Sequence, residues 1–341
     1  MKTYQYFAGA NTASGFYSFY NFLSPDTTNR VFILKGGPGV GKSTMLKSLA
    51  KELGRFHPVD LYHCSADVGS LDGIFIHDAE VSVLDGTAPH TIDPRLPGAV
   101  QEIVDLGIAW NRENLITKRS EILNLADSIS NSYSEAYRWL SLAAHWLNTA
   151  RPIVASPASE QAAASTAREI IASLPSLPKG RSQKAFATAI TSAGTVSYLA
   201  ELAKETNDLY ILSGTDRFFK TQVLETVAAH LSSQGAAVRY LYCGLQPGNI
   251  EHIYIPGVLG IFSSHPPHQL ALPGAREFSA GAISDSMPKP VSDTIAKAVN
   301  YLVRAKDLHA KMEKIYVPNT DFTVVNAKQA EILEFINSLN I

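Results

Sequence analysis

The sequence is poor in cysteine and has no excess of charge of either sign. Cys64 and Cys243 are the only cysteines among 341 residues, too few for a disulfide framework. Lysine and arginine number 29 against 31 aspartates and glutamates, which gives a formal net charge of −2. Because sequence-independent binding of nucleic acid needs a basic surface, this balance argues against nucleic acid as a partner.

Long apolar runs are also missing. No stretch reaches the roughly 18 apolar residues of a membrane-spanning helix. The first 20 residues are polar and aromatic and lack the charged start and apolar centre of a signal peptide. We therefore expect a cytoplasmic protein that does not associate with membranes.

The sequence instead contains an internal duplication. Residues 7–12 resemble 186–191, and residues 31–36 match 209–214 at an offset of 178. In the same order, Cys64 aligns with Cys243, Pro89-His90 with Pro267-His268, and Pro97-Gly98-Ala99 with Pro273-Gly274-Ala275. A period this long indicates duplicated domains and not a solenoid. A Pro/Gly/Ser-rich loop at 175–182 separates them, so we expect domains at 1–180 and 181–341.

Apolar periodicity predicts an α/β fold in each half. Short apolar runs at 31–34, 59–63 and 81–84 indicate buried strands, and residues 44–53 have helical spacing. Residues 12–15 are expected to open an aromatic-rich helix, and 99–150 to form long helices, in which Trp139 and Trp146 form a core stripe. The second half is expected to have a shorter helical insert at 291–314, a strand at 322–325 and a helix at 327–339. The predicted fold class is two tandem P-loop NTPase-like, three-layer domains with mostly parallel sheets, the first with a long helical insert.

Residues 36–44 fit the Walker A pattern between a predicted strand and a predicted helix. Glycines let backbone N–H groups turn inward around phosphates, and the following helix directs its positive end at them. The loop consists of Gly36, Gly37, Pro38, Gly39, Val40, Gly41, Lys42, Ser43 and Thr44. We expect Lys42 to contact the β- and γ-phosphates of a bound nucleotide.

Asp85 ends the third predicted strand and is a Walker B candidate. Ser43 and Asp85 are therefore the expected Mg²⁺ ligands, with Asp85 acting through water; the alternative for Asp85 is a turn-forming cap. Gly86 follows where many hydrolytic ATPases have a glutamate, a feature also found in small kinases. Because no Asn/Thr-Lys-x-Asp motif for guanine is present, we expect ATP and not GTP.

The second copy has lost this pattern. Arg217 replaces Gly39, Phe219 replaces Gly41, and Ser263 replaces Asp85, although Lys220 and Thr221 remain. We expect the bulky side chains to obstruct the loop, so that the second half binds ATP weakly or not at all.

Several residues near the carboxyl ends of the predicted strands are further catalytic candidates. Asp67 or Asp72 is a possible general base, or a turn-forming loop residue. His90 would sense the γ-phosphate or donate a proton, or be satisfied by the backbone of its loop. Arg95 would clamp the transferred phosphoryl group, or be a solvated loop residue.

Both halves retain a Cys and a Pro-His pair, so these residues could instead serve packing or a second ligand. One arrangement consistent with them is a metal site shared across a pseudo-twofold axis by Cys64, Cys243, His90 and His268. Nothing in their spacing requires such a site.

Four segments together resemble a bacterial family of tandem P-loop ATP-binding proteins, described as ATPases or as nucleotide-kinase-like. The segments are 7–19, 36–44, 63–73 and Leu-Asp-Gly-Thr-Ala-Pro-His at 84–90. The resemblance covers nearly the whole chain and implies ATP binding without an established substrate. In such proteins the second half often also looks like a working P-loop, and here it departs at Arg217 and Phe219.

Three functions remain open from the sequence. The first is hydrolysis of MgATP in the first half, with the second half relaying the nucleotide state to a protein partner or a second copy. The second is phosphotransfer to a nucleotide or small metabolite, with Asp67 or Asp72 as the base. The third is a regulator that holds ATP without turning it over.

Overall fold

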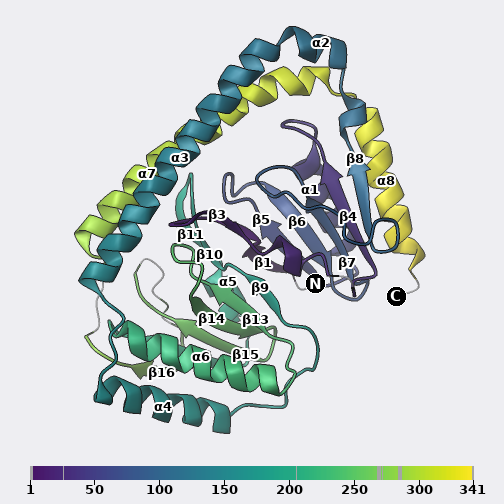
Figure 1. Ribbon diagram of the computed structural model, residues 1–341. Coiled ribbons are helices and arrows are strands. Elements are labelled where there is room, and N and C mark those ends of the chain that lie inside the picture. Colours follow the sequence, from purple (N-terminus) through teal and green to yellow (C-terminus); the bar gives the residue numbers. More distant parts are fainter. Residues whose placement is uncertain are drawn as a thin grey trace.

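The computed structural model describes residues 3–25, 27–204, 206–266, 270, 272–282 and 286–339. The chain is α/β, with two six-stranded, mostly parallel sheets and a smaller antiparallel sheet between the two halves (Figure 1). Among the described residues, no helix has both the length and the apolar character that crossing a bilayer requires.

The two large sheets have the same topology. The first has the strand order β1 (Thr3–Phe7), β5 (Val59–His63), β6 (Leu71–Ile76), β7 (Val81–Asp85), β4 (Arg30–Lys35) and β8 (Gln101–Asp105). The second, from β9 outward, runs β9 (Gln183–Ala185), β13 (Arg239–Tyr242), β14 (Ile250–Ile255), β15 (Leu259–Ser263), β12 (Asp208–Ser213) and β16 (Arg276–Ser279). In each sheet only the third strand is antiparallel to its neighbours. The three strands predicted in the first half are confirmed, whereas β6 was not predicted.

The helix expected to begin at residues 12–15 is a β-hairpin. Strands β2 (Gly9–Thr12) and β3 (Gly15–Ser18) flank a tight turn, in which Gly15 has φ +93° and the Thr12 hydroxyl donates to the Gly15 carbonyl. Since φ near +90° strongly favours glycine, the turn prevents a helix from forming here. The second repeat builds the same hairpin from β10 (Thr188–Thr191) and β11 (Gly194–Ser197), and β2 pairs with β10 to join the repeats.

Helices cover the outer face of each sheet, and they cross the sequence boundary near residue 180. On the first sheet, α1 (Lys42–Leu53) packs beside α8 (Phe322–Ser338), which comes from the second repeat. On the second sheet, α6 (Arg217–Ser233) packs beside α4 (Pro157–Ala172), which comes from the first. The strand expected at 322–325 is the first turn of α8, because the Asp321 carboxylate caps that helix by accepting from the Thr323 amide.

The inner faces of the two sheets share one core. Tyr6 and Ile33 from the first repeat are buried together with Tyr254 and Phe262 from the second. Helix α5 (Leu199–Lys204) contributes Leu199, Leu202 and Ala203 to the same core. The expected three-layer domains are therefore not complete within each repeat: each sheet has helices on its outer face, and its inner face packs against the other repeat, with α5 in the shared core.

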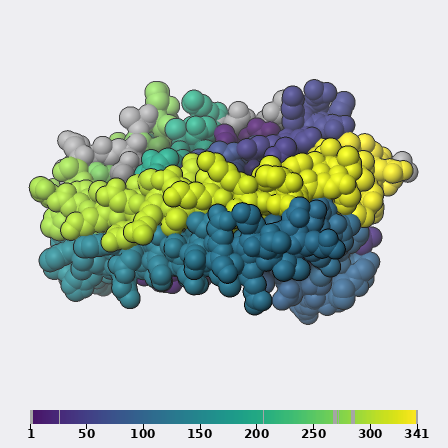
Figure 2. Space-filling view, turned by 90° about the horizontal axis from the view of Figure 1, so that it is seen from above, coloured from purple at the N-terminus to yellow at the C-terminus, as the bar shows by residue number. Residues whose placement is uncertain are grey.

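Two long helices bridge the repeats. Helix α3 (Arg119–Ala150) follows the short α2 (Arg112–Thr117) and packs against α7 (Lys289–Tyr316), and Figure 2 shows the two side by side across one face. The expected helix over 99–150 is partly wrong, because residues 101–105 form β8 and Ile103 is exposed. The expected tryptophan stripe is also partly wrong: Trp139 packs beside the α3–α7 core, whereas Trp146 is 40% exposed.

Candidate functional site

The Walker A segment forms the connection between β4 and α1. Gly39 has φ +69° and Gly41 has φ +94°, which are left-handed conformations that favour glycine. Within the described residues, the amide N–H groups from Gly39 to Thr44 donate no hydrogen bond to another part of the chain. These donors lie at the positive end of a 12-residue helix, so the loop is a ready receptor for an anion.

Lys42 points back across this loop. Its Nζ donates to the carbonyl oxygens of Gly36 at 2.7 Å and Gly37 at 2.9 Å. The same Nζ lies 3.6 Å from Oδ2 of Asp85. The Lys42 ammonium group thus lies between the loop and the end of β7, close to the amide groups from Gly39 to Thr44.

Asp85 reaches the loop because β7 and β4 are parallel neighbours. Leu34 pairs with Asp85, so the carboxyl ends of the two strands meet where the loop begins. Asp85 Oδ1 accepts from the Thr87 amide at 2.8 Å, and the Thr87 hydroxyl donates to the Gly36 carbonyl at 2.7 Å. The turn after β7 is therefore tied to the first residue of the loop. The predicted partner Ser43 is the second residue of α1, whose first residue, Lys42, lies 3.6 Å from Asp85.

Helix α7, from the second repeat, covers the loop and was not anticipated as part of the site. A Cβ atom at Gly39 would lie 2.8 Å from Val317, directly after α7, and one at Gly37 would lie 3.1 Å from Trp110. His309 lies on α7, and burial lowers the pKa of its imidazole. Glu313 opposes this effect and Lys42 adds to it. The sequence contains a signal for this face, because Lys306, His309 and Glu313 have the i, i+3, i+7 spacing of one helix stripe.

The two candidate bases occupy different environments. Asp67 is partly exposed and bonds to Ser70 Oγ and to Lys306 Nζ of α7, each at 2.8 Å. Burial raises the pKa of Asp67, but these two contacts outweigh it and lower the pKa overall. Asp72, expected in a loop, is instead a buried residue of β6. Burial is the main cause that raises the pKa of Asp72, with help from Asp85 and against the effect of His90.

Asp72 belongs to a buried cluster with Cys64 and His90. One ligand atom from each of the three lies within 4.8 Å of the others. His90 Nε2 is 3.2 Å from Asp72 Oδ2, and the rings of Phe16 and Tyr20 pack on the imidazole with centroids 5.0 and 5.1 Å away. The backbone amide of Leu71, the residue before Asp72, donates to Ser43 Oγ at 3.1 Å, so the cluster adjoins the Walker A segment. Arg95, by contrast, is exposed on its loop.

In the second repeat the helix begins earlier than its counterpart. Helix α6 starts at Arg217, whereas the residue equivalent to the start of α1 is Lys220. Asp216 caps α6, and its carboxylate accepts from the Phe219 amide at 2.9 Å. The chain's own carboxylate thus takes a position that the first repeat leaves open at its helix terminus.

This geometry changes the reason for expecting a poor ATP site there. Phe219, expected to obstruct the loop, is buried in the core of the second sheet. The Arg217 guanidinium donates to Asn148, to the Arg151 carbonyl and to Gln246, so it closes the region above the helix start. Lys220 keeps the contact of its counterpart, since its Nζ donates to the Gly214 carbonyl at 2.8 Å.

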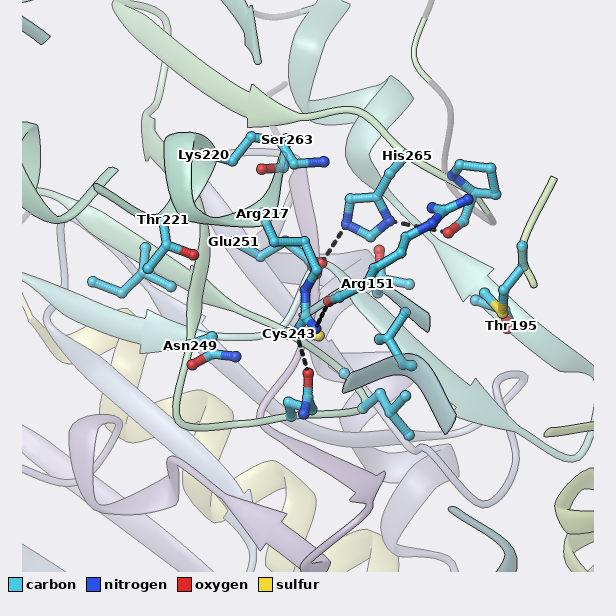
Figure 3. Close-up of a pocket in the computed structure, with 18 of the residues that line it drawn as sticks. Arg151, Thr195, Arg217, Lys220, Thr221, Cys243, Asn249, Glu251, Ser263 and His265 are labelled. Carbon is cyan, nitrogen blue, oxygen red and sulfur yellow. Dashed lines mark hydrogen bonds and ion pairs between the residues drawn. The ribbon is translucent and has the colours of Figure 1, made fainter. Parts of the chain in front are cut away.

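A cavity of about 110 Å³ lies beside this altered loop. Figure 3 shows Arg217, Lys220, Cys243, Glu251 and His265 around it. Glu251 Oε1 is 2.8 Å from His265 Nε2. Each cysteine thus has an acidic neighbour in its own repeat, Asp72 for Cys64 and Glu251 for Cys243. The fourth residue considered for a shared metal site, His268, lies outside the described residues.

Comparisons of the chain with protein-family models, with curated proteins and with solved structures find no match. The resemblance to tandem P-loop ATP-binding proteins therefore stays an expectation drawn from the motifs, and the function has to be inferred from the geometry of the site.

Proposed function

We propose that the first repeat is a P-loop NTPase site that binds ATP with Mg²⁺ at residues 36–44 and hydrolyses it, and that the second repeat is catalytically inactive. One observation carries this proposal. Six consecutive amide groups, from Gly39 to Thr44, have no acceptor within the described chain, and they surround the start of α1. Buried or half-buried N–H groups are normally paired, so such a row is suited to phosphate oxygens.

The side chains around the loop fit the same ligand. Lys42 is held by two loop carbonyls, which are contacts that it can exchange for phosphate oxygens without moving its backbone. The Ser43 hydroxyl and the Asp85 carboxylate are hard oxygen donors of the kind that Mg²⁺ prefers. Bound Mg²⁺ would neutralise part of the charge on the β- and γ-phosphates.

The contacts of α7 support coupling of the bound nucleotide to the rest of the molecule. Lys306 pairs with Asp67, and Val317 touches Gly39, so a change in the loop is felt by a helix that spans both repeats. Nucleotide switches commonly work by rearranging segments around the γ-phosphate. The second repeat would then transmit the nucleotide state to an unidentified protein partner or to a second copy of the chain.

Phosphotransfer is the second candidate, and Asp72 favours it. Its carboxyl group is buried next to the loop, where the preceding residue Leu71 bonds to Ser43, and burial raises its pKa. Asp67 is a weaker candidate base because Lys306 and Ser70 stabilise its ionised carboxylate and lower its pKa. An acceptor hydroxyl near Asp72 would lie on the side of Ser43 that faces β6.

The experiment is MgATP turnover by the full-length protein, alone and with a pool of nucleotides and metabolites, with ADP and free phosphate measured separately. Lys42→Ala is expected to lower turnover by about 100-fold or more, by analogy with loss of one preorganised charge-stabilising group. The duplication provides a matched control, Lys220→Ala, which should leave turnover unchanged.

Equal amounts of ADP and phosphate would support the ATPase, and ADP without matching phosphate, seen only with the pool, would establish a kinase. Tight ATP binding without turnover in either condition would indicate a regulator. Failure of the wild type to bind ATP, or equal losses in the two lysine variants, would refute the assignment of the site.

A further inference from the structure

The cluster of Cys64, Asp72 and His90 combines three kinds of metal ligand. Cys64 directly follows β5, Asp72 is the second residue of β6, and His90 lies in the turn after β7. A thiolate sulfur, a carboxylate oxygen and an imidazole nitrogen are the donors that Zn²⁺ uses in proteins. In a tetrahedral zinc site such atoms lie about 3.3 to 3.8 Å apart, as follows from metal–ligand distances of about 2.0 to 2.3 Å. The observed separations, all within 4.8 Å, need only small side-chain adjustments.

We propose that Cys64, Asp72 and His90 bind one divalent transition-metal ion of the Zn²⁺ type, separate from the Mg²⁺ that accompanies the nucleotide. Three protein ligands leave a fourth position open for water or for a further ligand. A sulfur donor selects against Mg²⁺, which prefers oxygen, so the two cations do not compete for the same donors. The inference goes beyond nucleotide binding and does not depend on it.

Unpaired polar atoms in the cluster support this assignment independently. Asp72 and His90 are only 5% and 8% exposed. Within the described residues, Asp72 Oδ2 accepts no hydrogen bond and His90 Nδ1 has no partner. A buried carboxylate needs a compensating charge or donors. Cys64 and Tyr20 act on Asp72 as side-chain donors, but neither carries a positive charge, and the imidazole nitrogen 3.2 Å away lacks hydrogen-bond geometry. A cation bound by Asp72 Oδ2 and His90 Nε2 supplies the positive charge that the buried carboxylate lacks, while His90 Nδ1 remains the non-coordinating nitrogen.

Rigid packing holds the imidazole in place. Phe16 and Tyr20 both contact the His90 ring, with edge-to-face and tilted geometry respectively. Both aromatic residues belong to the segment that precedes the loop, and neither offers a carboxylate that would compete for the nitrogen. The ring is thus oriented toward Asp72 without an ordinary hydrogen-bond partner.

The second repeat shows why the first is the better cation site. There the equivalent cysteine and acid, Cys243 and Glu251, lie in a cavity that is also lined by Arg151, Arg217 and Lys220. Three basic side chains oppose a cation, whereas in the first repeat the cluster has Asp85 nearby and Lys42 already paired with it. Cys243 is therefore a matched control: a cysteine at the equivalent position, in a similar fold, but in a positively charged setting.

The test is titration of the full-length, metal-stripped protein with Co²⁺, followed through the thiolate-to-cobalt absorption band, together with the zinc content of the purified protein. The variants are Cys64→Ser, Asp72→Asn and the control Cys243→Ser, with far-UV circular dichroism and Tm recorded for each. Wild type and Cys243→Ser should bind one equivalent with the thiolate band. Cys64→Ser should lose the band, and Asp72→Asn should keep it while binding Co²⁺ about 10- to 100-fold more weakly, a range typical of losses around metal sites.

Absence of the band in the wild type would overturn the proposal, as would its persistence in Cys64→Ser or its loss in Cys243→Ser. If Cys64→Ser does not fold, the Asp72→Asn affinity decides the outcome, and affinity equal to wild type would refute the site. Repeating the titration in Lys42→Ala separates this inference from the nucleotide site, because the cluster should still bind Co²⁺ when ATP binding is lost.

Discussion

A buried ion pair between the two repeats should be a main determinant of stability. Asp60 on β5 and Arg239 on β13 occupy equivalent positions of the duplication, offset by 179 residues, and they meet each other. Arg239 donates to Asp60 Oδ2 at 2.8 Å and to the Tyr6 hydroxyl at 2.6 Å. Asp60 is fully buried and Arg239 is 6% exposed. Two identical repeats would place two like charges here, so the divergence of this position lets the inner faces pack.

We expect Asp60→Asn to destabilise the fold strongly, because it leaves the Arg239 charge buried without its partner. Loss of one member of a buried pair costs about 3 to 5 kcal/mol. With about 2.1 cal/mol/K of unfolding entropy per residue, 341 residues give about 0.7 kcal/mol/K. For unfolding of both repeats in one transition, Tm should therefore fall by about 4 to 7 °C.

The assay is thermal unfolding followed by circular dichroism, with urea unfolding as a second measure. The control is Asp293→Asn, which breaks an exposed pair with Lys289 and should leave Tm nearly unchanged. A double variant, Asp60→Leu with Arg239→Met, should be less destabilised than Asp60→Asn because no lone charge remains buried. If Asp60→Asn shifts Tm no more than Asp293→Asn does, the pair does not contribute as argued.

Two further predictions concern the two loops. Gly39→Ala places a Cβ atom 2.8 Å from Val317 at a residue with φ +69°. With about 1 to 2 kcal/mol of backbone strain, ATP affinity measured by calorimetry should fall roughly tenfold. The control Gly248→Ala, where no atom lies within 4 Å of the added Cβ, should leave the affinity unchanged. In the second repeat, burial lowers the pKa of Lys220 from 10.5 to about 8, with the neighbouring arginines adding to the effect and Glu251 opposing it. Between these two pH values the unfolded chain binds more protons than the folded chain, so the folded state becomes more stable as pH rises. Urea unfolding should therefore show wild type gaining stability relative to Lys220→Met from about pH 8 to pH 10. The gain should be at most about 1.4 kcal/mol per pH unit. A difference that stays flat over this range would contradict the buried, deprotonating lysine.

Local patterns predicted the elements whose environment is set by nearby residues. Residues 31–53 predicted three consecutive elements: the strand before the loop, the loop itself and α1. The prediction was possible because an apolar run is followed directly by glycines and then by a helical apolar stripe. Strand β6 was missed because Asp72 and Gly73, its second and third residues, are typical of turns, although the strand is paired on both sides with antiparallel neighbours. The aromatic segment after residue 12 was assigned to a helix because its dense apolar residues hid the turn at Gly15.

The sequence predicted which residues lie together around the Walker A segment only as far as those residues come from one repeat. Lys42, Ser43 and Asp85 were expected together, and parallel pairing of β4 and β7 brings them to one edge. Lys306 and His309 were not expected there, since they are more than 200 residues from the loop along the chain. The second loop also differs from the expectation: Asp216 caps the start of α6, and Phe219 is buried in the core and does not lie across the loop.

The sequence alone determined that the protein is α/β, that it is duplicated, and that one copy keeps a glycine-rich Walker A pattern that the other has lost. These properties depend on periodicity and on short motifs, which act over a few residues. Tertiary structure alone decided that the sheets face each other, that α4 and α8 cross to the opposite repeat, and that Cys64, Asp72 and His90 converge. Such contacts join segments tens to hundreds of residues apart, and they form because burying the inner faces together excludes more water than either repeat could exclude separately.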